Sequence, residues 1–196
     1  MKTTWLPSRN PAFSPLRLDQ RSLVWQGLAL VLGTSILAAS SHVSVPMIPV
    51  PITMQTFAVT LIGALYGWRL GTATVVAWLV EGAAGMPVLA GGAGGLAPFM
   101  GPTAGYLFAF PLLAALTGFL AEKGWNGERP AFAFLSMMAA NILCLVVGAA
   151  VLAFMIGPEK AWMLGVVPFL VGAFLKSALA VAVLRLIARG GARRVS

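Results

Sequence analysis

Two charged side chains interrupt long apolar runs of this sequence: Glu81, in the run 70–85, and Lys176, in the run 161–187. A charge inside a membrane costs roughly 2.5 to 3.5 kcal/mol on insertion scales, so each is expected to face a partner or a water-filled site. One interpretation is a structural ion pair between them. The other is a cavity in which Lys176 binds an anionic group of a ligand and Glu81 lies in or beside the site.

Uncharged polar and aromatic side chains within the apolar runs are the next candidates for ligand binding. Asn141 has donors and an acceptor for a ligand amide, although such a residue also joins helices to each other. Gln55 opens an apolar run, where its amide would cap a helix or face the cavity. Trp78 and Tyr106 are suited to stacking on a ligand ring with a polar tip available, or else to simple packing. We therefore predict a binding site that combines these four residues with the two charged ones.

The uncharged stretch 85–103, GMPVLAGGAGGLAPFMGPT, is rich in glycine and proline and cannot form one continuous helix. Backbone that is not helical at membrane depth must pack on protein or line a cavity, because lipid cannot hydrogen-bond to it. Gly91 and Gly92 permit close approach of the backbone to a helix or to a ligand. We expect a re-entrant loop or lid, in which these two glycines face either another helix or the binding site. The match of Gly92, Gly94 and Ala97 to a dinucleotide-binding pattern is dismissed, since no soluble βαβ unit surrounds it.

Catalytic and metal-binding patterns are missing from the sequence. No His, Asp and Glu residues cluster at metal-ligand spacing, and Ser40 and Ser41 beside His42 have no orienting carboxylate nearby. Cys144 is the only cysteine, which excludes an internal disulfide and argues against thiol-based metal binding or redox chemistry. The expectation is a protein that is not an enzyme and has no metal or resident cofactor.

Composition places the elements that position these residues in a membrane. Hydrophobic residues make up 59% of the 196 positions and charged residues only 9%, which an ordinary water-soluble domain could not accommodate. The net charge of +8 does not indicate nucleic acid, because the cationic residues are scattered singly and form no stripe.

Six apolar runs are long enough, or nearly so, to cross the hydrocarbon core as helices. They cover residues 23–40, 52–66, 70–85, 104–121, 131–156 and 161–187, the second and third being short and closely joined. With the N-terminus inside, eleven of the thirteen Lys and Arg residues fall on the cytoplasmic side and only Lys160 falls outside, as the positive-inside rule requires. The predicted fold is an all-α, six-helix membrane bundle, with a cytoplasmic tail at 1–22, a membrane domain at 23–187, a basic tail at 188–196 and both termini in the cytoplasm.

A pair of small residues, Ala29 and Gly33, lies on one face of the first predicted helix. Small residues four positions apart allow another helix to approach closely. The pattern leaves open whether that helix belongs to this bundle or to another subunit.

Four blocks of sequence, taken in order, resemble the BioY family of biotin transporters. They are PVPITMQTFAV at 49–59, GALYG at 63–67, EGAAGMPV at 81–88 and GPTAGYL at 101–107, and the resemblance extends over most of residues 23–187. It implies a six-helix substrate-binding S component of an energy-coupling factor transporter, in the cytoplasmic membrane of a bacterium. The implied ligand is biotin, bound near the outer face, with Lys176 as the cation for its carboxylate.

The same resemblance implies partners. Such S components commonly work with a transmembrane coupling T component and two ABC-type ATPase subunits, so ATP would act only through these partners, and some members are thought to function as homo-oligomers. Ala29 and Gly33 would then form the docking face of the first helix.

Two positions depart from the family pattern. An Asp that precedes the family's lysine by three positions is replaced by Ala173, and a cation found in the glycine-rich stretch of some members is replaced by Ala93. Glu81 is the expected substitute for the missing carboxylate. An S component for another small vitamin and a noncatalytic membrane scaffold remain as alternatives.

Overall fold

The computed structural model of the chain describes residues 16, 18 and 21–192. Most of the predicted N-terminal tail and residues 193–196 of the predicted C-terminal tail lie outside this part of the chain. Residues 188–192, which were assigned to the C-terminal tail, form the last turn of a helix.

Five helices in the described part of the chain are long and apolar enough to cross a membrane. They are α1 (Leu23–His42), α2 (Gln55–Ala83), α4 (Ala104–Glu122), α5 (Pro130–Ile156) and α7 (Phe169–Ala192). Shorter elements connect them: strands β1 (Ser44–Val45) and β2 (Ile52–Thr53), the 3-10 turn η2 (Ala90–Gly92) and helices α3 (Ala97–Met100) and α6 (Pro158–Gly165).

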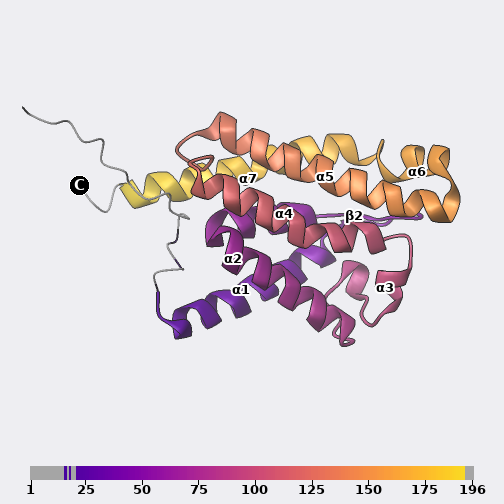
Figure 1. Cartoon of the computed structure of the whole chain (residues 1–196), viewed down its shortest axis with the longest axis horizontal. Coiled ribbons are helices and arrows are strands. Elements are labelled where there is room, and N and C mark those ends of the chain that lie inside the picture. Colours follow the sequence, from indigo (N-terminus) through magenta and orange to yellow (C-terminus); the bar gives the residue numbers. More distant parts are fainter. Residues whose placement is uncertain (1–15, 17, 19–20, 193–196) are drawn as a thin grey trace, which may run out of the picture.

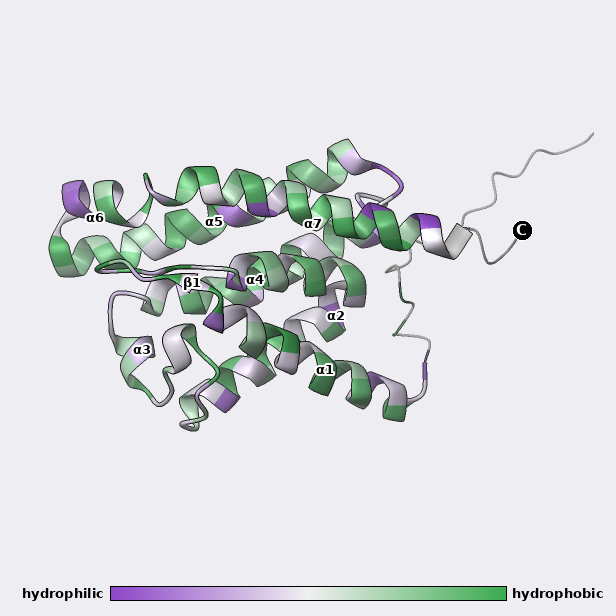
Figure 2. Cartoon of the chain, turned by 180° about the vertical axis from the view of Figure 1, so that it is seen from behind, coloured by the Kyte–Doolittle hydropathy of each residue, from purple (hydrophilic) through white to green (hydrophobic). Residues whose placement is uncertain are grey.

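The long helices form two layers (Figure 1). One contains α1, α2 and α4, and the other contains α5 and α7; α4 packs against both α2 and α5 and so joins the layers. The first residues of α1 and the last residues of α7 lie at the same end of the bundle, whereas α3 and α6 lie at the opposite end. Most residues of the long helices are hydrophobic (Figure 2), and many of their large hydrophobic side chains are exposed, as expected where lipid is the solvent.

Helix α2 reverses direction at Gly67, so it consists of two arms, 55–66 and 68–83. Gly67 has φ 81° and ψ 168°, a conformation open to glycine and strained for other residues. A Cβ built on Gly71 would lie 2.9 Å from the Cα of Gly63, whereas eight residues of a straight helix would separate the two by about 12 Å. The arms therefore lie against each other, and the prediction of two short, closely joined helices at 52–66 and 70–85 describes this region better than one long span.

The first backbone N–H of the second arm, that of Trp68, has a carboxylate as its hydrogen-bond acceptor. The backbone N–H of Trp68 donates to Glu122 Oε1 at 3.1 Å, from the end of α4. An acceptor at a helix N-terminus satisfies an otherwise unpaired donor and interacts favourably with the helix dipole. Gly118, one turn earlier on α4, lies against the backbone of Gly67 and Trp68. A Cβ at residue 118 would come within 2.7 Å of their atoms, so a larger residue would not fit there.

Two of the predicted membrane spans differ from the structure in their extent. Residues 52 and 53 were assigned to a helix but form β2, whose Ile52 and Thr53 pair in antiparallel register with Val45 and Ser44. The predicted span 161–187 is interrupted between α6 and α7. Pro168 directly precedes α7, and because it has no backbone N–H it cannot continue the hydrogen bonds of a helix that began before it.

Candidate functional site

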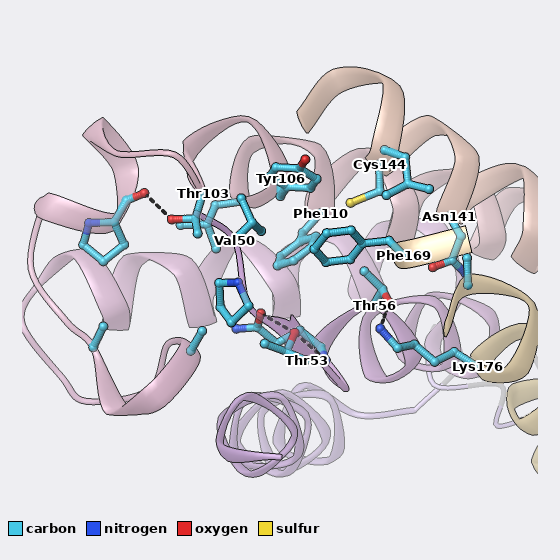
Figure 3. A pocket seen from close by; sticks show the side chains of 18 residues that line it. Val50, Thr53, Thr56, Thr103, Tyr106, Phe110, Asn141, Cys144, Phe169 and Lys176 are labelled. Carbon is cyan, nitrogen blue, oxygen red and sulfur yellow. Dashed lines mark hydrogen bonds between the residues drawn. The ribbon is translucent and has the colours of Figure 1, made fainter. Parts of the chain in front are cut away.

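A cavity of about 250 Å³ lies between α2, α4, α5 and α7 (Figure 3). This volume is close to the lower end of the roughly 300 to 1,000 Å³ typical of small-molecule sites. Most of its lining is apolar, and the β1–β2 connection and the segment 84–103 close its remaining sides. The lining residues are Val50, Pro51, Thr53, Gln55, Thr56, Ala90, Ala93, Pro98, Thr103, Tyr106, Leu107, Phe110, Asn141, Cys144, Leu145, Phe169, Ala173 and Lys176.

Lys176 is the only charged residue among those that line the cavity. It is partly buried, and its Nζ donates to Thr56 Oγ1 at 3.3 Å (Figure 3). Because an ammonium carries three donors, this one long hydrogen bond leaves donors for a ligand. Lys176 thus lies in the wall of the cavity, with a neutral hydroxyl as its neighbour.

Gln55 is the first residue of α2 and lines the cavity with its side chain 4% exposed. The hydroxyl of Thr53 accepts from the Gln55 backbone N–H at 3.3 Å and donates to Gln55 Oε1 at 2.8 Å. Because the Thr53 hydroxyl accepts from the backbone, its own proton remains free to be donated. That proton goes to Gln55 Oε1, which fixes the position of the amide oxygen. The amide nitrogen Nε2 is buried and has no protein partner within the described residues. Gln55 therefore has a buried, unpaired donor beside the cavity that the residue lines.

Asn141 enters the cavity from α5 (Figure 3). Its Nδ2 donates to the carbonyl of Met137 at 3.0 Å and to Ser177 Oγ at 3.2 Å. Both amide hydrogens are used within the protein, and the oxygen remains. Asn141 therefore joins α5 to α7 and leaves its oxygen as an acceptor at a residue that lines the cavity.

Aromatic rings form one wall of the cavity. Tyr106 and Phe169 stack with their centroids 6.2 Å apart, and the Tyr106 hydroxyl donates to the carbonyl of Gly165 at 2.8 Å. Trp78 does not line the cavity: it is fully buried behind Phe110, with the ring centroids 6.0 Å apart. The ring of Trp78 thus supports the wall and does not form its surface.

The glycine-rich segment contributes to the cavity through residues beside the predicted glycines. Gly91 and Gly92 have φ values of 66° and 76°, and this backbone turn presents the flanking Ala90 and Ala93 to the cavity. The carbonyl of Val88, just before this turn, is bound by side chains of two helices. It accepts from Trp78 Nε1 on α2 at 3.0 Å and from Ser41 Oγ on α1 at 2.8 Å.

Three further predicted residues, besides Trp78 and the two glycines, lie outside the cavity lining. Glu81 does not line the cavity, and within the described residues it forms no ion pair with Lys176. Gly33 is buried against the second helix of the same chain, since a Cβ there would meet Tyr66 and Thr74. Ala29 is partly buried against the same core. The close neighbour of the small pair is thus inside this bundle, and neither residue is exposed on α1.

Several lining residues were missed by sequence reasoning, although helical spacing points to them. Phe110 lies four positions after Tyr106, and Cys144 lies three positions after Asn141, so each pair shares a helix face. Phe169 lies on the face of Lys176 two turns earlier. Helical spacing does not point to Thr56 or Ser177. Thr56 on α2 contacts Lys176 on α7, and Ser177 on α7 contacts Asn141 on α5. Each contact joins two helices that are distant in sequence.

This arrangement is suited to binding a small molecule. No group of three or more His, Cys, Asp or Glu residues within the described part of the chain could hold a metal ion. An apolar cavity with one cation, one fixed amide donor and one fixed amide acceptor matches a largely apolar, anionic ligand that carries its own donor and acceptor.

Comparisons with known proteins identify relatives over most of the chain. The model of the BioY family matches residues 15–193. The probable biotin transporter BioY of Pyrococcus horikoshii is 36% identical over 152 residues, which cover 78% of this chain and 89% of the relative. The biotin transporter BioY of Thermotoga maritima is 38% identical over 137 residues, which cover 69% of this chain and 79% of the relative. Among solved structures, the S-component for biotin from an ECF-type ABC transporter matches with a TM-score of 0.76 at 28% identity, covering 85% of this chain and 92% of that one.

Proposed function

The chain belongs to the BioY family, and we propose that it binds biotin in the cavity between α2, α4, α5 and α7 and carries it across a membrane. Its relatives are named as transporters and not as enzymes, which agrees with the expectation drawn from the sequence.

The observation that carries this proposal is the set of polar groups in the cavity. Biotin has a cyclic urea with one carbonyl acceptor and two N–H donors, an apolar ring and chain, and a carboxylate. Gln55 Nε2 provides a donor for the carbonyl, Asn141 Oδ1 an acceptor for an N–H, and Lys176 a cation for the carboxylate. The stacked rings of Tyr106 and Phe169 provide apolar surface.

For the membrane topology we propose six crossings, with the two arms of α2 counted separately and both termini in the cytoplasm. The ends of the described chain share one end of the bundle (Figure 1). The turn at Arg69 and the connection that contains Lys123 and Arg129 belong to that same side in this scheme. The membrane would be the cytoplasmic membrane of a bacterium.

For energy, we propose that the chain works with a transmembrane coupling T component and two ABC-type ATPase subunits. A solved protein that shares this fold is the S-component for biotin from an ECF-type ABC transporter, which supports an assembly of this kind. Docking through the first helix would use a surface of α1 other than Gly33, because that residue already packs on α2. A homo-oligomer is the alternative assembly, and copurification of the expressed chain with and without the three partner subunits distinguishes the two.

The single cysteine offers a test that needs no substitution in the site. Cys144 lines the cavity and is 2% exposed, so a bound ligand should shield it further. We expect titration calorimetry to detect biotin binding by the purified chain in detergent. We also expect saturating biotin to slow the reaction of Cys144 with a small methanethiosulfonate reagent at least tenfold.

A Cys144→Ser variant, which should not be labelled, controls for the identity of the modified residue. Biotin that binds without slowing the labelling would place the ligand outside this cavity. No binding of biotin to a monodisperse, folded protein would refute the proposed ligand.

A second candidate ligand is another small vitamin. The specific observation in its favour is Ala173, which lines the cavity at the position where the family resemblance led us to expect a carboxylate. Competition decides between them: under our proposal, tenfold excesses of thiamine, riboflavin, niacin or pantothenate leave biotin binding unchanged.

A further inference from the structure

Ser177 lies outside the cavity lining but touches a residue inside it. It is fully buried on α7, next to Lys176 in sequence and on a different face of the helix. Its hydroxyl donates to the Ala173 carbonyl at 2.7 Å and accepts from Asn141 Nδ2 at 3.2 Å.

The contact of this hydroxyl with the Ala173 carbonyl determines which part of the Asn141 amide it can bind. A serine hydroxyl has one proton, and the Ala173 carbonyl can only accept it. Toward Asn141, therefore, Ser177 Oγ can act only as an acceptor, and it requires the NH₂ side of the amide. The carbonyl of Met137, which can also only accept, takes the other amide hydrogen at 3.0 Å.

We propose that Ser177 is a positioning residue that holds the Asn141 amide with Oδ1 toward the cavity, so that the site accepts a hydrogen bond from a ureido N–H of the ligand. This inference rests on the proposed binding of biotin. It assigns the two cavity amides opposite roles: Gln55, held by Thr53, donates, and Asn141, held by Ser177, accepts. A cyclic urea, with a carbonyl beside an N–H, has the complementary pattern.

A rotated Asn141 would put its NH₂ group against the N–H of the urea, and neither group could accept. Loss of Ser177 removes one of the two contacts that prevent this rotation. We therefore expect Ser177→Ala to weaken biotin binding about fivefold although Ser177 does not line the cavity.

The matched control is Ser136→Ala on α5. Ser136 is 1% exposed, does not line the cavity, and its Oγ has no hydrogen-bond partner within the described residues. The same substitution at the same burial should leave biotin affinity within twofold of the wild type.

The decisive measurement is a double-mutant cycle with biotin affinity as the readout. If Ser177 acts through Asn141, then Ser177→Ala adds less than a twofold change when Asn141 is already alanine. A fivefold loss that persists in the Asn141→Ala background, or an equal loss in Ser136→Ala, overturns the positioning role, since a general packing defect would be additive. Thermal unfolding of each variant in detergent verifies that the compared proteins are folded. If the wild-type chain binds no biotin, the proposed function fails, and this inference fails with it; if it binds and the cycle is additive, only this inference fails.

Discussion

The charge of Lys176 should act on the carboxylate of the ligand and on no other part of it. Lys176→Met keeps the apolar stem that packs in the cavity and removes the ammonium. A hydrogen bond to a charged group is worth about 1.5 to 3 kcal/mol, and about 1.4 kcal/mol corresponds to a tenfold change in affinity. Because Lys176 is only partly buried and keeps a bond to Thr56, values above this range are not expected. Biotin affinity should fall about 10- to 150-fold.

The assay compares biotin with biotinamide, which is neutral at the end of its chain. Titration calorimetry on the wild type should show a preference for biotin within the range just given, and Lys176→Met should bind the two ligands within threefold of each other. Lys160→Met serves as the control, since Lys160 is exposed on α6 and does not line the cavity. Equal losses of biotin and biotinamide affinity in Lys176→Met would refute the reasoning, because the lysine would then support the cavity without meeting the carboxylate.

Three further substitutions test the walls and the polarity of the site. Gly148→Ala places a Cβ in contact with the ring of Tyr106. Such overpacking costs about 1 to 3 kcal/mol, so the thermal unfolding temperature and biotin affinity should both fall. Unchanged values would show that the ring relaxes freely. Gln55→Glu replaces the cavity donor with an acceptor, so binding of 2-iminobiotin relative to biotin should rise about tenfold in a competition assay, and an unchanged ratio would place the urea away from residue 55. Trp78→Phe removes the hydrogen bond to the Val88 carbonyl, worth about 1 kcal/mol; hydrogen exchange in segment 85–95 should become faster while exchange in α5 does not, and uniform acceleration would indicate general destabilisation instead.

The sequence predicted the main helices because membrane spans have a strong compositional signal. Charge and glycine placed the boundary between the two arms of α2 near Gly67, and the structure has its break at that residue. The boundaries failed where local geometry overrides hydropathy. Ile52 is apolar enough for a membrane helix but pairs with Val45 in a hairpin. The residues between α6 and Pro168 are as apolar as a membrane span, although α6 has already ended at Gly165.

Within the site, the sequence identified residues whose polarity is unusual for their surroundings. Lys176, Asn141 and Gln55 stand out in apolar runs, and all three line the cavity together with Tyr106. Glu81 stands out equally and lies elsewhere, because hydropathy does not state which face of a helix a residue occupies. The partners Thr56 and Ser177 could not be predicted, since threonine and serine are common in membrane helices and their roles depend on which helices pack together.

The polar groups of the cavity differ in how firmly they are held, and this difference assigns them different parts in binding. The amides of Gln55 and Asn141 are held by buried hydrogen bonds of 2.8 Å to Thr53, 3.0 Å to Met137 and 3.2 Å to Ser177, so they bind without first losing rotamer freedom. Lys176 has a flexible stem and one long bond. A fixed donor and acceptor discriminate between ligands by geometry, because a mismatched ligand leaves buried polar groups unpaired, whereas a mobile cation attracts any anionic chain of suitable length. Substitutions around the amides should therefore change which ring system is accepted, and substitutions at Lys176 should change how tightly every carboxylate ligand binds.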